Sequence, residues 1–360
     1  MKGRILYKIA FLYSRLSGYF QACLRTLKST YDVRTLVYHF PTSENAPFKN
    51  DNYSSIDLKH LNDNASYKEI LNNLKIFSPD VILVSGWMDK EYLKVARHFK
   101  KRNVLTIAMS DAQWQNNLKQ NFIRFVLKGY LHSCFDYFWV AGERQKAFAH
   151  KLGFNGNSCL TGIYSCDWES FAFDPLKNDS KKKNTFLYTG RYVDIKGLDT
   201  LIEAYQEYRM ISKNPWKLIF AGKGPNAYLL NGKIGIENRG FVQPDKLPSI
   251  MRKSGAFVLP SKQEPWGVVI HEATSAGLPI LCSDSAGAAV HLVRDGYNGH
   301  VFQPGNVNQL SRQMLKIERL ETTDLQLMGH RSYELSKQFT PSLWADTLME
   351  ILKSNSNYET

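Results

Sequence analysis

The chain has 360 residues, of which 43% are hydrophobic and 22% are charged, the balance of a globular protein with room for two domains. No run approaches the roughly 18 uncharged apolar residues of a membrane-spanning helix. The five cysteines are scattered and odd in number, which argues against a disulfide framework and against a structural zinc site. They indicate reduced thiols in a cytoplasm.

The net charge is +13, and the first half of the chain is the more basic. Residues 1–174 hold 23 Lys and Arg against 15 Asp and Glu. Such an excess suits nucleic acid, an anionic membrane or anionic small substrates, and it equally suits a solvated surface kept soluble by charge. Nucleic acid is not expected as a partner, because no recognition motif accompanies the charge.

Short apolar runs recur along the chain, most of them followed by a helical pattern. The first run is interrupted by Lys8 and Arg15, so it is predicted to be a β-strand rather than a secretion signal. Near-continuous apolar strands that alternate with helices indicate parallel sheets covered on both faces. The predicted strands are 7–14, 33–40, 80–86, 104–111, 136–142 and 157–163, then 185–190, 216–222, 236–242, 255–261, 278–284 and 299–305.

The array predicts an α/β fold with two doubly wound, Rossmann-like domains that face each other across a cleft. The first domain covers residues 1–170 and the second residues 185–339. Between them, residues 171–184 are polar and charged, as in a linker, and residues 340–360 form a helix. Ligands of such sheets bind outside the carboxyl ends of the strands, so the cleft is the expected site.

The stretch "KQEPWGVVIHEATSAGLP" (262–279) places two carboxylates eight positions apart. Pro265 and Gly267 rule out a continuous helix through Glu264, and the apolar spacing becomes helical only from Val268. Glu264 is therefore expected in a loop and Glu272 in the first turns of a helix. Both lie near a helix N-terminus, which favours an anion. A surface glutamate beside a helical one is the plainer alternative.

The stretch "TGRYVDIKGLDTLIEAY" (189–205) follows the first strand of the second domain. Arg191 and Lys196 lie in a loop closed by Gly190 and Gly197, directly before a helix. Two cations beside a helix N-terminus suit a diphosphate leaving group, since Arg can bind it bidentately and Lys adds a point charge. Taken alone, the two side chains are more typical of a solvated surface.

Together these segments resemble the family-4 glycosyltransferases of group 1 type, which have the GT-B fold. Their signature is a pair of glutamates spaced as Glu264 and Glu272 are, and the family pattern usually continues differently at Gly287, Ala288 and His291. The resemblance implies that Glu272 holds the ribose hydroxyls and that Glu264 lies at the sugar ring. The segments that carry it are "YTGRYVDIKGLDTLIEAY", "LIFAGKGP", "RGFV", "FVLPSKQEPWGVVIHEATSAGLPILCSD" and "VRDGYNGHVFQPGN".

The resemblance also implies how the phosphates are bound. Arg191 and Lys196 would hold the donor diphosphate, with Gly190 beside them. The backbone at Gly267 and Val268 would meet sugar and phosphate. On the same resemblance, the last helix crosses back onto the first domain.

The resemblance is weaker in the first half. Gly18 follows the first strand where the family has a glycine-rich loop near the donor phosphates. Asp111 ends the fourth predicted strand, where many members place a His or an acidic residue against the donor sugar, although a helix N-cap is an equal alternative. Trp87 and Trp114 would stack on a sugar or simply pack in the core, and packing is the more common fate.

Two basic, amphipathic segments in the first half, residues 90–103 and 116–135, are candidates for docking on an anionic inner leaflet. In the second segment Lys119, Arg124 and Lys128 alternate with apolar residues. Ordinary core-facing helices with a solvated basic face would show the same pattern.

The resemblance implies a retaining glycosyltransferase that moves a hexose from a nucleotide diphosphate sugar to a glycan or lipid-linked glycan acceptor, as in surface polysaccharide or lipopolysaccharide synthesis. Arg191, Lys196, Glu264 and Asp111 form the expected catalytic set. No cofactor and no metal are expected, since no Asp-x-Asp triplet is present and cationic side chains would serve instead. A cytoplasmic location is expected, with the inner face of the membrane as an alternative. A non-catalytic GT-B protein that binds nucleotide sugar or glycan for a partner is the rival interpretation.

Overall fold

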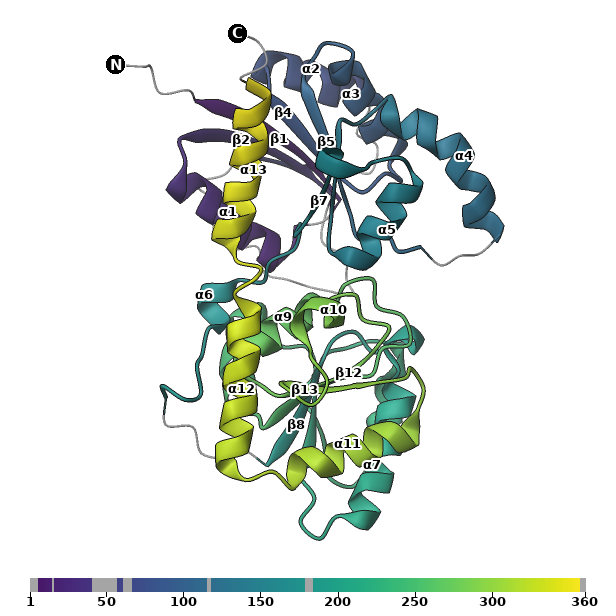
Figure 1. Cartoon of the computed structure of the whole chain (residues 1–360), viewed down its shortest axis with the longest axis vertical. Coiled ribbons are helices and arrows are strands. Elements are labelled where there is room, and N and C mark those ends of the chain that lie inside the picture. The colour runs from purple at the N-terminus through teal and green to yellow at the C-terminus, as the bar shows by residue number, and fades with distance from the viewer. Residues whose placement is uncertain are drawn as a thin grey trace. The chain divides into compact units, whose positions relative to one another are not determined.

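The computed structural model describes residues 6–14, 16–40, 57–60, 67–114, 118–178 and 184–356. The chain divides into two compact units, which Figure 1 shows with their elements labelled. Unit 1 comprises Met1–Ser165 and Pro341–Thr360, and unit 2 comprises Cys166–Thr340. The chain therefore passes between the units twice, at residues 165–166 and at residues 340–341.

Unit 1 is built on a parallel sheet of seven described strands in the order β3-β2-β1-β4-β5-β6-β7. The order reverses at β1, which has β2 on one side and β4 on the other. The short edge strand β3 has no counterpart among the predicted strands. The strands are β1 (Tyr7–Tyr13), β2 (Val33–His39), β3 (Asp57–His60), β4 (Val81–Ser85), β5 (Leu105–Ser110), β6 (Tyr137–Val140) and β7 (Cys159–Thr161).

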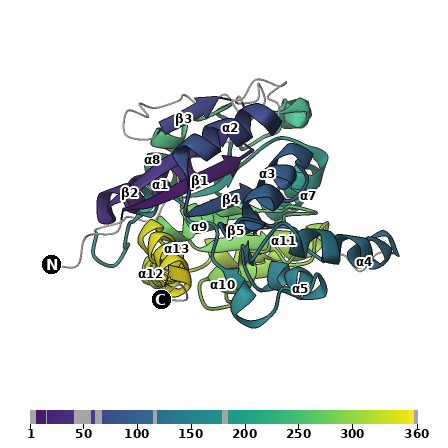
Figure 2. The ribbon, with the colours of Figure 1, turned by 90° about the horizontal axis from the view of Figure 1, so that it is seen from above.

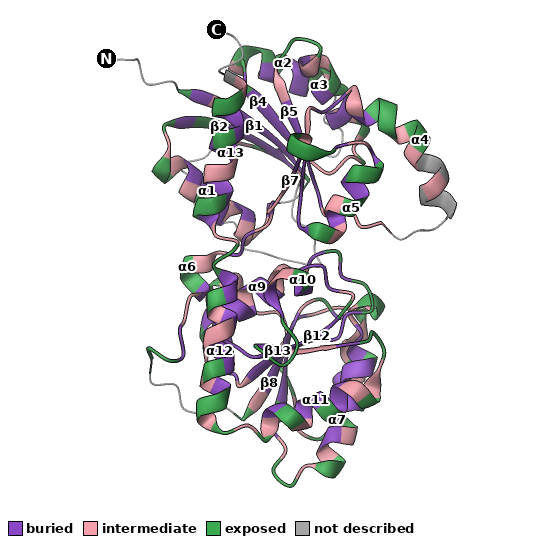
Figure 3. Cartoon of the chain, in the orientation of Figure 1, coloured by how far each residue is buried: buried purple, intermediate pink, exposed green. Residues whose placement is uncertain are grey.

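Helices cover this sheet, and one of them comes from the far end of the chain. The helices are α1 (Gly18–Thr30), α2 (Tyr67–Phe77), α3 (Lys90–Lys100), α4 (Leu118–His132), α5 (Glu143–Lys151) and α13 (Pro341–Ser356). Figure 3 shows the strands of the sheet as largely buried and the outer helix faces as exposed. The apolar runs of the sequence thus form the core because both faces of each inner strand are covered.

Unit 2 repeats the arrangement with six described strands in the order β10-β9-β8-β11-β12-β13, all parallel. Each strand corresponds to a predicted one. The strands are β8 (Thr185–Thr189), β9 (Lys217–Ala221), β10 (Ile236–Asn238), β11 (Ala256–Leu259), β12 (Ile280–Ser283) and β13 (Gly299–Phe302). The helices are α6 (Trp168–Phe171), α7 (Leu198–Ile211), α8 (Leu247–Arg252), α9 (Val268–Ser275), α10 (Ala289–Leu292), α11 (Val307–Glu318) and α12 (Thr322–Ser336). The two doubly wound sheets expected from the sequence are confirmed.

Helix α13 packs against α1 and supplies part of the core of unit 1. Trp344, only 2% exposed, stacks on Trp139 at 5.3 Å and on Phe11 at 6.2 Å between ring centroids. The Tyr31 hydroxyl donates to Asp346 over 2.6 Å. The last helix is therefore a structural part of unit 1 rather than a tail.

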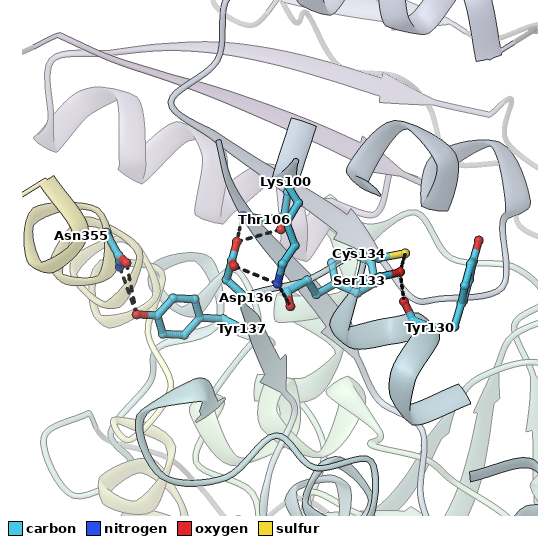
Figure 4. A network of polar contacts seen from close by, with 9 residues as sticks. Lys100, Thr106, Tyr130, Ser133, Cys134, Asp136, Tyr137 and Asn355 are labelled. Carbon is cyan, nitrogen blue, oxygen red and sulfur yellow. Dashed lines mark hydrogen bonds and ion pairs between the residues drawn. The ribbon is translucent and has the colours of Figure 1, made fainter. Parts of the chain in front are cut away.

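Figure 4 shows a polar network at the amino ends of β5 and β6. Asp136 accepts from the backbone N–H and hydroxyl of Thr106, at 2.9 Å each, and pairs with Lys100 at 2.9 Å. Tyr137, the next residue, is hydrogen-bonded to Asn355 of α13. The network connects α3, β5, β6 and α13 at the amino ends of the strands. Ligands of such sheets bind at the opposite, carboxyl ends, so the role of the network is structural.

The described part of the predicted linker packs on unit 2. The N–H of Phe173 donates to the carbonyl of Ser275 over 2.9 Å, and Asp174 lies 2.9 Å from His330. Among the described residues, no helix is both long and apolar enough to cross a membrane.

Candidate functional site

The predicted donor residues of unit 2 gather where its strand order reverses. Strand β8 has β9 on one side and β11 on the other, so the loops that follow β8 and β11 leave neighbouring strand ends. A parallel sheet leaves open space at such a reversal, because the connections depart in opposite directions. The loop after β8 carries Arg191 and Lys196, and the loop after β11 carries Glu264.

The two loops lie against each other through their backbones. Gly197 has φ +67°, and a Cβ there would collide with the carbonyl of Pro260, so only glycine fits. Next to it, the N–H of Lys262 donates to the carbonyl of Ile195 over 2.8 Å. This contact fixes the position of Lys196 relative to the second loop.

Lys196 and Glu264 form an ion pair, with side chains 14% and 9% exposed. Ser261 donates to the same carboxylate oxygen over 3.1 Å. The carbonyl of Ser261 in turn accepts hydrogen bonds from the hydroxyls of Ser283 and Ser285, at 2.5 and 2.6 Å. The carboxylate is thus held by partners from two segments, one of which is itself held by hydroxyls of a third. A nearly buried pair of this kind is sensitive to loss of either member, because the other charge is left without compensation.

Arg191 differs from Lys196 in that its side chain is exposed and makes no ion pair with a described residue. Its backbone is held, since the hydroxyl of buried Tyr188 donates to the Arg191 carbonyl over 2.9 Å. Gly190, with φ +154°, lies so close to Gly222 that a Cβ at residue 222 would collide with the Gly190 carbonyl. The loop backbone is therefore fixed, and the guanidinium remains available to an anion.

Helix α9 begins next to the ion pair. Gly267 caps it with φ +93°, and a Cβ there would come within 3.0 Å of the Glu264 side chain. Val268 opens the helix, and the N–H of Ile270 donates to the carbonyl of Gly267 over 2.9 Å, which leaves the N–H groups of Val268 and Val269 without a partner within the helix. These two N–H groups and the two cations of the loop after β8 form a set of donors for a polyanion such as a diphosphate.

Glu272 lies in the second turn of α9 and is half-buried. Burial, with the charge of Asp167 adding to it, raises the pKa of its carboxyl to about 7. Its side chain makes no hydrogen bond to the described residues. A carboxylate placed in this way gains by accepting hydroxyl hydrogen bonds from a ligand.

His271, the neighbour of Glu272, was not among the residues predicted from sequence. It is buried, its Nδ1 accepts from the N–H of Cys166 over 3.0 Å, and its Nε2–H donates to the carbonyl of Ser336 over 2.9 Å. Burial lowers the pKa of the imidazole to about 4, so it stays neutral near pH 7. It ties α9 to the segments where the chain enters and leaves unit 2.

We expect His271→Phe to lower the free energy of unfolding by about 2 kcal/mol, because a buried N–H and a buried carbonyl lose their partner. The phenyl ring keeps the ring volume and the contact with Phe339, whose centroid lies 6.1 Å away. Wild-type stability should also fall more steeply than that of the variant as the pH drops from 6.5 toward 4, since only the unfolded imidazole binds a proton there. Urea unfolding at several pH values measures both effects, and equal stability of the two proteins would contradict the assigned contacts.

The predicted residues of unit 1 lie at the carboxyl ends of its strands. Gly18 is the first residue of α1, after β1, and Asp111 follows β5. Asp111 caps no described helix, since α4 begins only at Leu118; it accepts a hydrogen bond from the Tyr164 hydroxyl over 3.2 Å. Tyr19, next to Gly18, contacts the Tyr164 ring edge-on at 5.5 Å. Tyrosine side chains therefore connect these two positions.

The two tryptophans that were predicted either to stack on a sugar or to pack in the core are packed in unit 1. Trp87 and Trp114 each contact Phe148, with ring centroids 6.1 Å apart. In unit 2, the residues that depart from the family pattern support the loop around Glu264. The N–H of Gly287 donates to the carbonyl of Glu264 over 3.1 Å, and the His291 ring lies against Trp266.

Among the described residues, one group has the composition of a metal site, namely Asp174, His330 and Glu334 of unit 2. His330 lies 2.9 Å from Asp174, and Lys337 pairs with Glu334 at 2.6 Å. These partners account for the group as an ion-pair network that ties residues 171–178 to α12. It does not include the residues of the predicted donor site.

The chain resembles known proteins both in its sequence and in its fold. Residues 171–334 match the sequence model of the family "Glycosyl transferases group 1". The resemblance seen in the sequence is thereby confirmed for this group 1 region, which holds the ion pair and α9.

Relatives with names of their own agree with the group 1 assignment. An uncharacterized glycosyltransferase of Methanocaldococcus jannaschii is 32% identical over 177 residues, which are 47% of each chain. The chain thus spans about half the length of that relative. A Campylobacter jejuni N,N'-diacetylbacillosaminyl-diphospho-undecaprenol alpha-1,3-N-acetylgalactosaminyltransferase is 24% identical over 306 residues, which are 78% of this chain and 76% of that protein.

The whole chain shares its fold with solved GT-B structures. HepE of Anabaena, solved in complex with UDP, superposes with a TM-score of 0.76 at 17% identity and covers 96% of this chain and 100% of its own. The GT-B fold expected from the sequence is confirmed, and it extends beyond the group 1 region to unit 1.

Proposed function

We propose that the chain is a glycosyltransferase that moves a hexose from a nucleotide diphosphate sugar to a glycan or lipid-linked glycan. The observation that carries the proposal is the Lys196–Glu264 pair beside the start of α9, at the strand reversal of a group 1 region. A cation and helix N–H groups suit the diphosphate, while a carboxylate held beside them suits sugar hydroxyls.

The proposed reaction retains the anomeric configuration. The bond from the anomeric carbon to the diphosphate oxygen breaks, and the bond to the acceptor oxygen forms on the same face. Charge develops on the departing diphosphate, where Arg191, Lys196 and the N–H groups after Gly267 stabilise it. The acceptor hydroxyl gives its proton to a diphosphate oxygen, so no protein base is required. Asp111 and Gly18 of unit 1 are proposed to contact the donor's sugar and phosphates.

The acceptor class is proposed from a relative and from the charge of the chain. The Campylobacter relative is named for transfer to a sugar on diphospho-undecaprenol, an acceptor with a lipid tail and two phosphates. The net charge of +13 suits an anionic acceptor of that kind. We accordingly place the activity in the cytoplasm, where nucleotide sugars would serve as co-substrates, in the synthesis of surface polysaccharide or lipopolysaccharide.

A panel of radiolabelled nucleotide sugars, preceded by a calorimetric screen of UDP, GDP and ADP, tests this function. A transferase should bind one nucleotide and slowly hydrolyse the matching donor in the absence of acceptor. Binding without any turnover, with or without acceptor glycans, would instead favour a non-catalytic protein that serves a partner.

We also expect the reaction to proceed without a divalent metal. Addition of EDTA should leave the transfer rate nearly unchanged, because cationic side chains and a helix terminus face the phosphates. The measurement is transfer of labelled sugar before and after chelation. Loss of activity that manganese or magnesium restores would refute this part of the proposal.

A further inference from the structure

A cationic hollow that the donor site does not use lies in unit 1 along α3 and the turn after it, beside the start of α2. Its volume is about 330 Å³. Lys94 and Arg97 lie three residues apart on one face of α3, and Lys101 and Arg102 follow in the turn that ends the helix. The residues lining the hollow are Tyr67, Lys94, Arg97, His98, Lys101 and Arg102.

The charge at this hollow is strongly positive. Glu91 pairs with Lys94 at 2.6 Å, and among the described residues it is the acidic residue that forms an ion pair with a cation of the hollow. Arg97, Lys101 and Arg102 are exposed cations without an ion pair to a described residue. Burial and the charges of Arg102 and Lys75 lower the pKa of His98, as expected in a positive field. The hollow is therefore suited to an anion.

Helix α4 exposes apolar side chains, and it meets α3 at a contact between a cation and an aromatic ring. Phe125 is 72% exposed and Val126 is 68% exposed, whereas Leu131 on the inner face is fully buried. The guanidinium of Arg97 lies 5.9 Å from the centre of the Tyr130 ring, so α3 and α4 approach each other at this point. In both Figure 1 and Figure 2, α4 extends away from the sheet of unit 1. The side chain of Lys119, one of the basic residues predicted to alternate with apolar ones, lies outside the part of the chain that the structure describes.

We propose that the α3–α4 surface, formed by Lys94, Arg97, Lys101, Phe125 and Val126, docks on an anionic phospholipid bilayer. The hollow beside α3 receives a lipid phosphate group, and the two exposed apolar side chains of α4 enter the interfacial region of the bilayer. Two large exposed apolar side chains are unfavourable in water, and their combination with the cations of the contacting helix α3 matches a surface with anionic headgroups above hydrocarbon.

Sedimentation with vesicles tests the docking. Vesicles of phosphatidylcholine alone are compared with vesicles of phosphatidylcholine and phosphatidylglycerol in equal parts, at low and high salt. We expect binding to require the anionic lipid and to weaken with salt, since the cations act across solvent. Equal binding to both vesicles, or binding to neither, would overturn the proposal.

Two paired substitutions separate this surface from the net charge. Arg97→Gln with Lys101→Gln should weaken vesicle binding about tenfold or more, since each removes a cation near the lipid. The matched control is Arg312→Gln with Lys316→Gln, the same residue types at the same spacing on an exposed face of α11. We expect the control to lose no more than about twofold. An equal loss in both variants would show that overall charge, not this surface, drives binding.

The apolar part is tested by Phe125→Ser with Val126→Ser. This variant should lose about tenfold in vesicle binding while keeping the salt dependence of what remains. Nucleotide affinity should be unchanged in all these variants, so a failed donor assay leaves the docking result standing and the reverse also holds. Unchanged vesicle binding of the serine variant would refute the apolar contact. Binding of single-stranded RNA that depends on Arg97 and Lys101, without vesicle binding, would replace the bilayer by nucleic acid.

Discussion

Replacing Lys196 or Arg191 by alanine is expected to raise the activation free energy of transfer at saturating donor by about 2–4 kcal/mol. The turnover number should therefore fall on the order of 30-fold to 1,000-fold. Each cation would stabilise charge that develops on the leaving diphosphate, so its contribution is larger in the transition state than in the bound donor. The turnover number should therefore fall more than the donor affinity.

The activity losses of the two variants should have different causes, because of these two cations only Lys196 forms an ion pair with a described residue. Lys196→Ala also leaves the nearly buried carboxylate of Glu264 without its cation, whereas exposed Arg191 has no such partner among the described residues. Part of the Lys196→Ala defect is then a cost imposed on Glu264. The double variant Lys196→Ala with Glu264→Gln removes that charge, and a double-mutant cycle with both single variants isolates the coupling.

Steady-state kinetics with the full donor, together with calorimetry of the nucleotide, measures these effects. Wild-type turnover of either alanine variant at saturating donor would refute the role of that residue. Lys262→Ala is a suitable control, since this exposed lysine of the same region pairs with Asp199 at 2.6 Å and is assigned no contact with the donor. It should keep nearly full turnover.

The second large effect separates the two glutamates. If Glu272 holds ribose, Glu272→Gln should weaken the free nucleoside diphosphate and the intact donor alike, since both contain that ribose. If Glu264 faces the sugar, Glu264→Gln should lower turnover and leave nucleotide affinity nearly unchanged. A hydrogen bond between carboxylate and hydroxyl contributes roughly 1.5–3 kcal/mol, so each effect should be about tenfold to a hundredfold.

Titration adds an independent signature for Glu272. Its pKa is raised to about 7 in the free protein, and hydroxyl donors that favour the charged form would lower that pKa in the complex. Nucleotide binding then releases a proton, so affinity should rise with pH up to about 7 and level off above it. Glu272→Gln is the control, because its own pH dependence reports the titration of the nucleotide phosphates alone.

Calorimetry with the nucleotide and kinetics with the donor distinguish the outcomes. Loss of nucleotide binding in Glu264→Gln but not in Glu272→Gln would reverse the assigned roles. Indifference of both variants would mean that the spacing of the two glutamates is coincidence. Because Lys196 pairs with Glu264, a gain in diphosphate affinity in Glu264→Gln would indicate that the pairing competes with the phosphates.

The strands were predictable because their signal is local. Near-continuous apolar runs such as 80–86 and 255–261 belong to strands buried on both faces, and these patterns correspond to β4 and β11. Strand β3, with the sequence "DLKH", was missed because a short edge strand needs no apolar run. Its position follows from pairing with β2, which the sequence does not display.

Contacts between distant segments were beyond local patterns. The pairing of Lys196 with Glu264 joins residues 68 positions apart and depends on β8 and β11 being neighbours. Tyr164 reaches Asp111 from 53 positions away, which replaces the helix N-cap that Asp's general preference allowed. His271 gave no signal because a buried histidine with two backbone partners looks like any other residue in a helix. The donor roles themselves rest on the family resemblance and await the variants above.

Helix α13 has a consequence for synthesis of the chain on the ribosome. Unit 1 begins the chain, yet Trp344 and the rest of α13 emerge only after the whole of unit 2. Until then the nascent first unit leaves Trp139 and Phe11 without the ring that covers them. Exposed aromatic surface of this kind promotes aggregation, so the newly made chain should depend on chaperones until its last helix docks. A circularly permuted gene that places residues 341–356 directly after residue 165 should relieve that dependence.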